Sequence, residues 1–170
     1  MVQLGEFKFG DRLSPGVSVS ADRLAVTNQA IGWKRGMLEP AISTAERAYV
    51  EWLIEEPGAG CSILLGVTAL DALPPGSLYD NPSSRMYDCD DSTAYPGNRD
   101  WGASGRRAAG DRVGLLVHEG RLSVYLNGER LGPGPMAGDL PGPHVRFCVE
   151  MCLPGTWVRV VAGARPPPGV

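Results

Sequence analysis

The sequence has little basic charge and no long hydrophobic run, and these absences exclude several classes of protein. It contains only two lysines, Lys8 and Lys34, and its formal net charge is −3 with the arginines scattered along the chain. A nucleic-acid-binding domain needs a clustered basic surface, so we expect no nucleic-acid partner. No apolar run approaches the roughly 20 residues of a membrane-spanning helix, and no charged start followed by an apolar core marks a signal peptide. We therefore expect no membrane partner.

Cysteine is also scarce, with Cys61, Cys89, Cys148 and Cys152 as the four examples. Cys61 and Cys148 lie in apolar, strand-like segments, where a free cysteine behaves as a small buried hydrophobe. A chain of 170 residues can bury a core that needs no covalent cross-link. The sequence therefore predicts no disulfide and a cytoplasmic, reducing setting. Cys148 and Cys152 lack a second pair of ligands at zinc spacing, so we expect no metal site.

Signatures of catalysis are absent as well. The two histidines, His118 and His144, have no nucleophile beside them in a known local pattern, and we expect no enzyme activity and no cofactor. Asp88, Asp90 and Asp91 lack the glycine and the terminal glutamate of a helix-flanked calcium loop. We interpret these aspartates as turn residues that cap backbone N–H groups.

Turn-forming residues, in contrast, are abundant, with 23 glycines and 15 prolines. In "GDRVGLLVHEGRLSVYLNGERLG" (110–132), Asn127-Gly128 fits a type I′ turn and "HEG" a looser turn of the same kind. Between the turns Leu122, Val124 and Leu126 alternate with polar residues, which places them on one face of a strand. The segment therefore predicts a three-stranded antiparallel meander with one buried face.

The same signals recur along the chain and predict roughly ten short strands with almost no helix. Residues 17–27 are expected to form two strands, 45–56 and 61–70 a hairpin, and 144–151 and 156–163 two further strands. Residues 28–44 are expected to be a loop, and residues 71–110 are expected to be rich in turns. This pattern is typical of an all-β antiparallel sandwich or barrel. The residues expected to face its interior are Leu122, Val124, Leu126, Phe147, Val149, Val158 and Val160, and Leu126→Ala is expected to cost roughly 2 to 5 kcal/mol.

Several segments together carry a family pattern: "AYVEWLIEE", "CSILLGVT", "MYDCDDSTAYPGN", residues 110–132 and "HVRFCVEM". The pattern resembles the SPRY domain and its close relative, the neuralized homology repeat. Its most specific part is a Gly-Asp, a Val-Gly, a short hairpin and an Asn-Gly followed by Leu-Gly, in this order within 110–132. The segment before "AYVEW" lacks the family's glycine, and "MYD" replaces its Trp and Gly, so the subfamily stays open. The match spans 17–163, and we predict one SPRY-like domain over 1–163 with a Pro-rich tail or linker over 164–170.

The resemblance implies a two-sheet sandwich of jelly-roll, concanavalin-like type. Family members use loops at one end of the sandwich to bind a protein or a short peptide, and they are not enzymes. Many act as the targeting domain of a ubiquitin ligase or another scaffold. Two alternatives stay open from the residues: a lectin-type sandwich that binds carbohydrate or Ca²⁺, and a structural or oligomerisation domain.

A candidate binding surface follows from the unusual composition of residues 79–101, which read as one long loop rich in aromatic, Arg and Asp residues. Aromatic residues and arginine supply most of the affinity at protein interfaces. The loop at 33–35 and the turn at 154–157 are expected to join this surface. Tyr87 and Trp101 have an alternative interpretation as core residues. The candidate partner-binding residues are Trp33, Arg35, Tyr79, Asp80, Arg85, Tyr87, Asp90, Tyr95, Arg99, Trp101 and Trp157.

Overall fold

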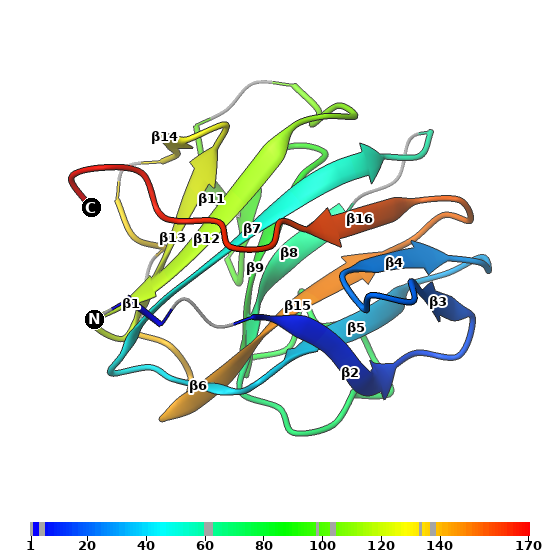
Figure 1. Cartoon of the computed structure of the whole chain (residues 1–170), viewed down its shortest axis with the longest axis horizontal. Coiled ribbons are helices and arrows are strands. Elements are labelled where there is room, and N and C mark those ends of the chain that lie inside the picture. The colour runs from blue at the N-terminus through cyan, green and yellow to red at the C-terminus, as the bar shows by residue number, and fades with distance from the viewer. Residues whose placement is uncertain are drawn as a thin grey trace.

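Two antiparallel β-sheets packed face to face form the whole of the described structure (Figure 1). The computed structural model describes residues 2–3, 6–59, 63–97, 99–102, 105–132, 134–136 and 139–170. Within these ranges the chain forms sixteen strands and no helix, so none of these residues belongs to a helix that could cross a membrane. The all-β sandwich that the sequence predicts is confirmed.

The first sheet, sheet A, has the strand order β14-β13-β12-β7-β16-β4-β3, with β1 paired in parallel to the start of β7. Its strands are β1 (Val2–Gln3), β3 (Val17–Val19), β4 (Ala25–Asn28), β7 (Arg47–Glu56), β12 (Arg112–His118), β13 (Arg121–Leu126), β14 (Glu129–Arg130) and β16 (Trp157–Val160).

The second sheet, sheet B, has the order β11-β10-β9-β8-β15-β5-β2, with β6 paired to the start of β15. Its strands are β2 (Lys8–Leu13), β5 (Lys34–Glu39), β6 (Ile42–Ser43), β8 (Ile63–Thr68), β9 (Ser84–Asp88), β10 (Thr93–Tyr95), β11 (Arg99–Asp100) and β15 (His144–Met151).

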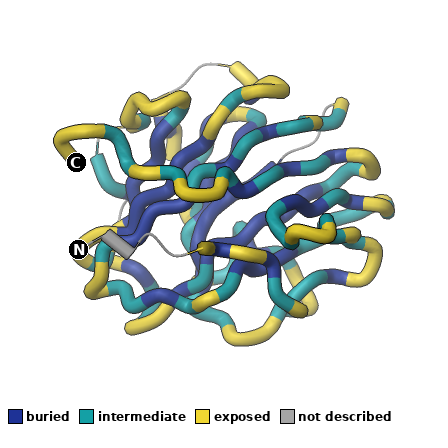
Figure 2. The backbone as a smooth tube through the Cα atoms, in the orientation of Figure 1, coloured by how far each residue is buried: buried dark blue, intermediate teal, exposed yellow. Residues whose placement is uncertain are grey.

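The core lies between the sheets and takes alternate residues from the strands of both. Figure 2 shows the buried residues gathered in the middle of the molecule. The Trp52 ring of β7 lies 5.9 Å from the Phe9 ring of β2, and Phe7 meets Phe147 edge to face at 5.1 Å. Six of the seven residues that the sequence places in the interior are buried, and Leu126 is partly buried against the same core. Period-two spacing therefore identifies the interior face correctly.

The meander over residues 110–132 is confirmed in its turns and in its register. Val113 pairs with Leu126, and Leu115 pairs with Val124, as a tight hairpin requires. Asn127 and Gly128 both have positive φ, at 50° and 85°, which is the geometry of a type I′ turn. Glu119 and Gly120 repeat this geometry in the turn before β13.

Two sequence predictions about pairing are wrong. Residues 28–44 are not one loop, because they contain β5, a strand paired on both sides with β15 and β2. β7 and β8 do not form a hairpin, since β7 pairs with strands of sheet A and β8 pairs with β9 and β15 of sheet B. The connection between β7 and β8 crosses from one sheet to the other.

The prediction of one long loop over residues 79–101 is also wrong. β9, β10 and β11 form a short antiparallel meander there, because Ala94 pairs with Tyr87 and also with Arg99. The long connector lies earlier, over residues 69–83 between β8 and β9. This connector, called the 69–83 segment below, lies against the face of sheet B that points away from the core.

The expectation that all four cysteines are free is wrong. Cys152 is disulfide-bonded, whereas Cys89 and Cys148 are free and buried. Cys61 lies outside the described residues. Cys152 follows the last residue of β15 and is only half-buried, so the argument from buried apolar strands, which holds for Cys148, does not apply to it.

The face of sheet A that points away from the core is covered by the end of the chain. Tyr49, Leu116 and Tyr125 form a small cluster there, and Ala164 packs on it. Figure 1 shows this end in red, crossing in front of β7 and β12. The start of the predicted tail is therefore packed on the domain.

Candidate functional site

Two of the eleven candidate residues belong to the core and cannot contact a partner. Tyr87 is fully buried, and its hydroxyl lies 3.0 Å from the Ser92 hydroxyl. Burial raises the pKa of Tyr87 to about 12, which keeps the phenol neutral. Trp101 is also buried, packed so tightly that a Cβ on Gly132 would lie 2.5 Å from its Nε1. Tyr87 and Trp101 therefore leave the candidate surface, as their alternative interpretation allows.

Three other candidates come together on the outer face of sheet B, although they come from distant parts of the sequence. The Trp33 ring centroid lies 5.8 Å from that of Tyr79, and Tyr79 lies 5.3 Å from Tyr95 in an edge-to-face contact. All three rings are partly exposed. They pack on a second, smaller apolar cluster, which consists of Met37, Leu64, Leu78, Met86 and Cys148. We call Trp33, Tyr79 and Tyr95 the aromatic ladder.

Ile31, which lies close to Trp33 along the chain, is an exposed apolar residue that was missed from the sequence. Its side chain is 84% exposed, and among the described residues Ile31 and Val170 are the large hydrophobic residues classed as exposed. It lies two residues before Trp33, in the connection from β4 to β5. Gly32 of this connection donates its N–H to the carbonyl of Cys152 at 3.1 Å, which joins it to the β15–β16 turn. Residues 28–33 show no periodic pattern, so the sequence offers no signal that distinguishes an exposed isoleucine here from a buried one.

A buried ion pair holds the 69–83 segment in place beneath the ladder. Glu150 of β15 is completely buried, and its Oε2 accepts hydrogen bonds from Arg35 Nε at 2.7 Å and from the Leu78 N–H at 2.8 Å. Arg35 also donates to the carbonyl of Pro74 at 3.2 Å. Arg35 is therefore a structural anchor for the residues that carry Tyr79, and it is not a surface contact as predicted.

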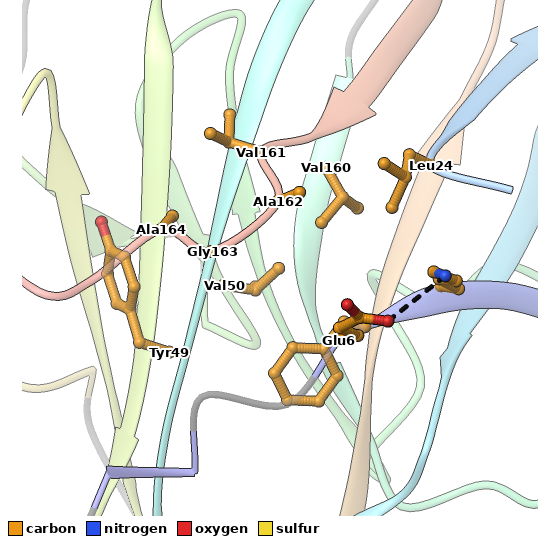
Figure 3. A pocket seen from close by; sticks show the side chains of 11 residues that line it. Glu6, Leu24, Tyr49, Val50, Val160, Val161, Ala162, Gly163 and Ala164 are labelled. Carbon is orange, nitrogen blue, oxygen red and sulfur yellow. Dashed lines mark ion pairs between the residues drawn. The ribbon is translucent and has the colours of Figure 1, made fainter. Parts of the chain in front are cut away.

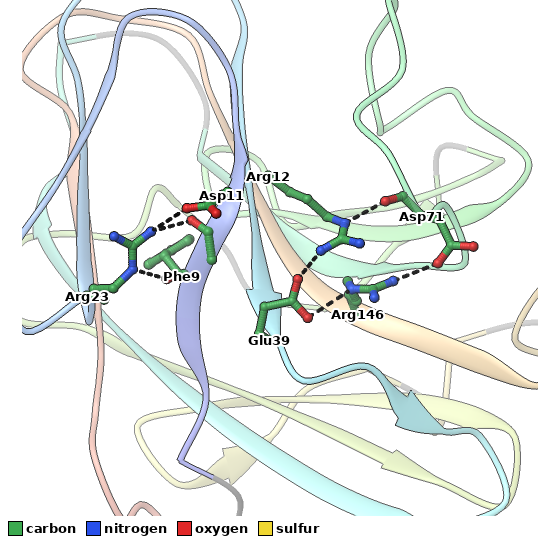
Figure 4. A network of polar contacts seen from close by, with 8 residues as sticks. Phe9, Asp11, Arg12, Arg23, Glu39, Asp71 and Arg146 are labelled. Carbon is green, nitrogen blue, oxygen red and sulfur yellow. Dashed lines mark hydrogen bonds and ion pairs between the residues drawn. The ribbon is translucent and has the colours of Figure 1, made fainter.

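A second polar network fixes the start of the same segment (Figure 4). Arg146 of β15 donates to Asp71 Oδ1 at 2.9 Å, and Arg12 of β2 donates to the Asp71 carbonyl at 2.5 Å. Both arginines also contact Glu39 of β5, which lies between them. The segment is thus attached to sheet B at two points, and the ladder is held in one arrangement before any partner binds.

The remaining candidates are spread over other places. Asp80 and Arg99 are exposed, whereas Asp90 pairs with Arg106 at 2.9 Å. Arg85 donates to the carbonyls of Pro82, Ser84 and Asp139, so its guanidinium is engaged within the domain. Trp157 lies in β16 of sheet A and is not part of the ladder.

Asp88, at the end of β9, and Asp91 act as turn caps, as the sequence predicts, whereas Asp90 pairs with Arg106. Asp88 accepts a hydrogen bond from the Asp90 N–H at 2.8 Å, and Asp91 accepts one from the Thr93 N–H at 3.0 Å. Within the described part of the chain, no three His, Cys, Asp or Glu side chains are grouped to hold a metal ion.

A separate pocket of about 430 Å³ opens in sheet A, where β16 ends beside the start of β7 (Figure 3). The chain turns away at Gly163, which has a φ of 68°, instead of following β7 further. The walls are mostly apolar, and its charged residues, Glu6 and Lys8, pair with each other at 3.3 Å. The pocket therefore offers an apolar hole with little to orient a ligand. Its lining residues are Glu6, Phe7, Lys8, Leu24, Tyr49, Val50, Val160, Val161, Ala162, Gly163 and Ala164.

No family model and no curated protein matches the sequence, but solved structures share its fold. The SPRY domain of human HERC1 is 15% identical, with a TM-score of 0.75 over 91% of this chain and 97% of that domain. A human SPRY domain is 20% identical, with a TM-score of 0.68 over 95% and 99% of the two chains. The TRIM65 PSpry domain is 15% identical, with a TM-score of 0.68 over 92% of each. The chain has the SPRY fold, as the resemblance predicts.

Proposed function

We propose that this domain is a non-catalytic protein-recognition module whose partner binds the aromatic ladder and Ile31. The observation that carries the proposal is a set of partly exposed Trp and Tyr rings that the fold fixes in advance. Aromatic residues of this kind supply affinity at interfaces because they bury a large area at a low cost in side-chain entropy. The SPRY fold supports the proposal, because solved SPRY domains share the whole architecture.

The shape of the apolar surface argues for a peptide or a small epitope as the ligand. Exposed large hydrophobic side chains in the described residues are limited to Ile31 and Val170, so there is no extensive apolar face of the kind an obligate oligomer buries. A role as the targeting domain of a ubiquitin ligase or scaffold rests on the family resemblance alone, and the cytoplasmic setting rested on the expectation that all four cysteines are free. The disulfide at Cys152 removes the redox argument for that compartment.

The experiment is a capture of proteins from cell lysate by the immobilised domain and by a variant carrying Trp33→Ala, Tyr79→Ala and Tyr95→Ala. We expect captured proteins to be lost from the variant, since truncating a hot-spot aromatic costs at least about 2 kcal/mol of binding. A variant carrying Glu129→Ala and Arg130→Ala, in the exposed strand β14, is the matched control. Equal capture by all three folded proteins would place the binding surface elsewhere, with the pocket in sheet A as the next candidate.

A further inference from the structure

Carboxylates surround the aromatic ladder on the outer face of sheet B. Asp80 is exposed and directly follows Tyr79. Burial raises the pKa of Tyr95, and the negative charges of Asp88 and Asp91 raise it as well. The ladder is therefore set in a region of negative potential.

Strand register adds a further carboxylate to this face. Tyr95 pairs with Met86, which belongs to the outer cluster, so Thr93 points to the same side as Tyr95. Asp100 is the partner of Thr93 across β10 and β11 and is exposed, so it shares this face. Arg99 is the partner of Ala94, a core residue, and therefore lies on the opposite face of the sheet.

The nearby cationic side chains do not cancel this charge. Arg35 is paired with the buried Glu150, and Arg106 is paired with Asp90. Lys34 pairs across β5 and β15 with Met151, a core residue, and so points to the other face of sheet B. Arg12 and Arg146 are taken up by Glu39 and Asp71 at the far end of the 69–83 segment. The exposed carboxylates of Asp80, Asp91 and Asp100 are thus left to act on a ligand, whereas Asp88 is buried and is not counted among them.

Exposed aromatic rings and carboxylates together have a definite binding preference. The face of an aromatic ring attracts cations, and arginine is the cation most often found there. The Tyr79 and Tyr95 rings are inclined at 65° to each other, so a planar guanidinium can stack on one ring while it meets the edge or hydroxyl of the other. Carboxylates at the rim add charge attraction and accept the N–H groups of the guanidinium.

We infer that the aromatic ladder binds a peptide segment with an arginine or lysine side chain over Tyr79 and Tyr95 and an apolar residue against Ile31. This inference rests on the proposed function and names the chemistry of its partner. The acidic rim disfavours acidic segments, because like charges at an interface repel. The apolar pocket in sheet A has no comparable charge preference, because its two charged side chains pair with each other.

The test begins with short random peptides displayed on phage and selected on the purified domain. We expect the enriched peptides to carry Arg or Lys beside an apolar residue. In a synthetic copy of an enriched peptide, changing the basic residue to Gln is expected to weaken binding about tenfold, and changing it to Glu should weaken it further. These peptide changes leave the domain untouched, so they cannot be confused with misfolding.

Variants of the domain test the same inference from the other side. A variant carrying Asp80→Asn, Asp91→Asn and Asp100→Asn is expected to bind the basic peptide about fivefold more weakly and to lose most of the salt dependence. Asp22→Asn is the matched control, because Asp22 is an exposed carboxylate that pairs with Arg159 on sheet A. It should leave the affinity for the basic peptide and its salt dependence unchanged. Tyr79→Phe should retain binding because it keeps the ring, whereas Tyr79→Leu should lose it.

The outcomes separate this inference from the proposed function. Enriched peptides that are neutral or acidic, or that tolerate the change to Gln, yet still depend on Tyr79 and Tyr95, overturn the inference and leave the proposed function standing. Peptides that bind equally well to the ladder variants, or no enrichment at all, overturn both.

Discussion

Arg35 and Glu150 form an ion pair beneath the aromatic ladder, with Arg35 Nε 2.7 Å from Glu150 Oε2 and no solvent exposure of the Glu150 side chain. The Leu78 N–H is a second donor to the same oxygen, whereas the other oxygen, Oε1, has no hydrogen-bond partner among the described atoms. A fully buried carboxylate whose one cationic partner is Arg35 depends strongly on that arginine. The pair therefore connects the stability of sheet B to the position of the residues that carry Tyr79.

Arg35→Met should destabilise the domain by about 3 kcal/mol near pH 7, because it leaves a buried carboxylate without its cation. Burial raises the pKa of Glu150 above its ordinary value of 4.5 even with Arg35 present, and removing Arg35 raises it further. A raised folded-state pKa means that the folded state holds the proton more tightly. The stability that Glu150 contributes by holding this proton is complete below its unfolded-state pKa. It is lost as the pH rises through its folded-state pKa.

The stability deficit of Arg35→Met should therefore be larger at pH 7 than near pH 5, and urea denaturation at both values measures it. Arg112→Met is the control, since its pair with Glu51 is half exposed and should contribute no more than about 1 kcal/mol. Equal deficits of Arg35→Met at the two pH values would mean that Glu150 is not the group that titrates.

Gly66→Ala should strongly destabilise the domain, whereas Gly76→Ala should be nearly neutral. A Cβ on Gly66 would lie 2.0 Å from the carbonyl oxygen of Arg85 and 2.8 Å from the Met86 Cα, both backbone atoms of the neighbouring strand. The strands must separate to admit it, at a cost of at least about 1 to 3 kcal/mol. A Cβ on Gly76 meets nothing within 4 Å. Thermal melting of the two variants measures the difference, and equal melting temperatures would contradict the close approach of β8 and β9 at Gly66.

Leu115→Ala should cost more than Leu126→Ala. Leu115 is fully buried in the core, and its loss leaves a cavity that costs about 2 to 5 kcal/mol. Leu126 is only partly buried, so the same change there should cost about half as much or less, below the value expected from the sequence alone. Chemical denaturation of both variants gives their free energies of unfolding. A larger loss of this free energy for Leu126→Ala than for Leu115→Ala would show that Leu126 is more buried than Leu115.

The sequence predicts the meander well because its turns and its periodicity are both local signals. Asn127-Gly128 specifies the turn, the turn specifies the register, and the register places Leu122 and Val124 on the inner face. The strand β5 gives no such signal. Met37 packs in the outer cluster and Leu38 in the inner core, so the strand is buried on both faces and shows no alternation.

The pairing partner of a strand is a long-range property, and this explains the false hairpin between β7 and β8. Consecutive strands usually pair, so adjacency in sequence favours a hairpin. In this sandwich the chain changes sheets between the two strands, and β7 finds its partners in β12 and β16. Nothing in residues 45–70 alone distinguishes these two arrangements.

The sequence predicts the kinds of residue in the candidate site, but it does not predict which of them face outward. Tyr87 and Tyr95 belong to the same aromatic-rich segment, yet Tyr87 pairs with Ala94 and faces the core, whereas Tyr95 pairs with Met86 and faces out. The hairpin register decides this difference, and the sequence does not fix that register. Arg35 was chosen for its charge, but its partner Glu150 is 115 positions away along the chain.

A count of free thiols distinguishes the sequence expectation, in which all four cysteines are free, from the structure, in which Cys152 is disulfide-bonded. Cys89 and Cys148 are free thiols in fully buried positions, and burial raises the pKa of both, so neither should react with a thiol reagent in the native protein at neutral pH. Cys152 is disulfide-bonded. When it is purified without reductant and then denatured, the protein should present two of its four cysteines as reactive thiols. After reduction, all four cysteines should react.

The measurement is a titration with a chromophoric thiol reagent under native, denaturing and reducing conditions. Cys148→Ala is the matched control and should lower the denatured count by one without changing the native count, because Cys148 is buried against Met86. Four reactive thiols in the denatured, unreduced protein would show that the bond at Cys152 does not form in solution, and the case for a reducing compartment would be restored. Two reactive thiols would instead show that the bond at Cys152 forms and persists when no reductant is present.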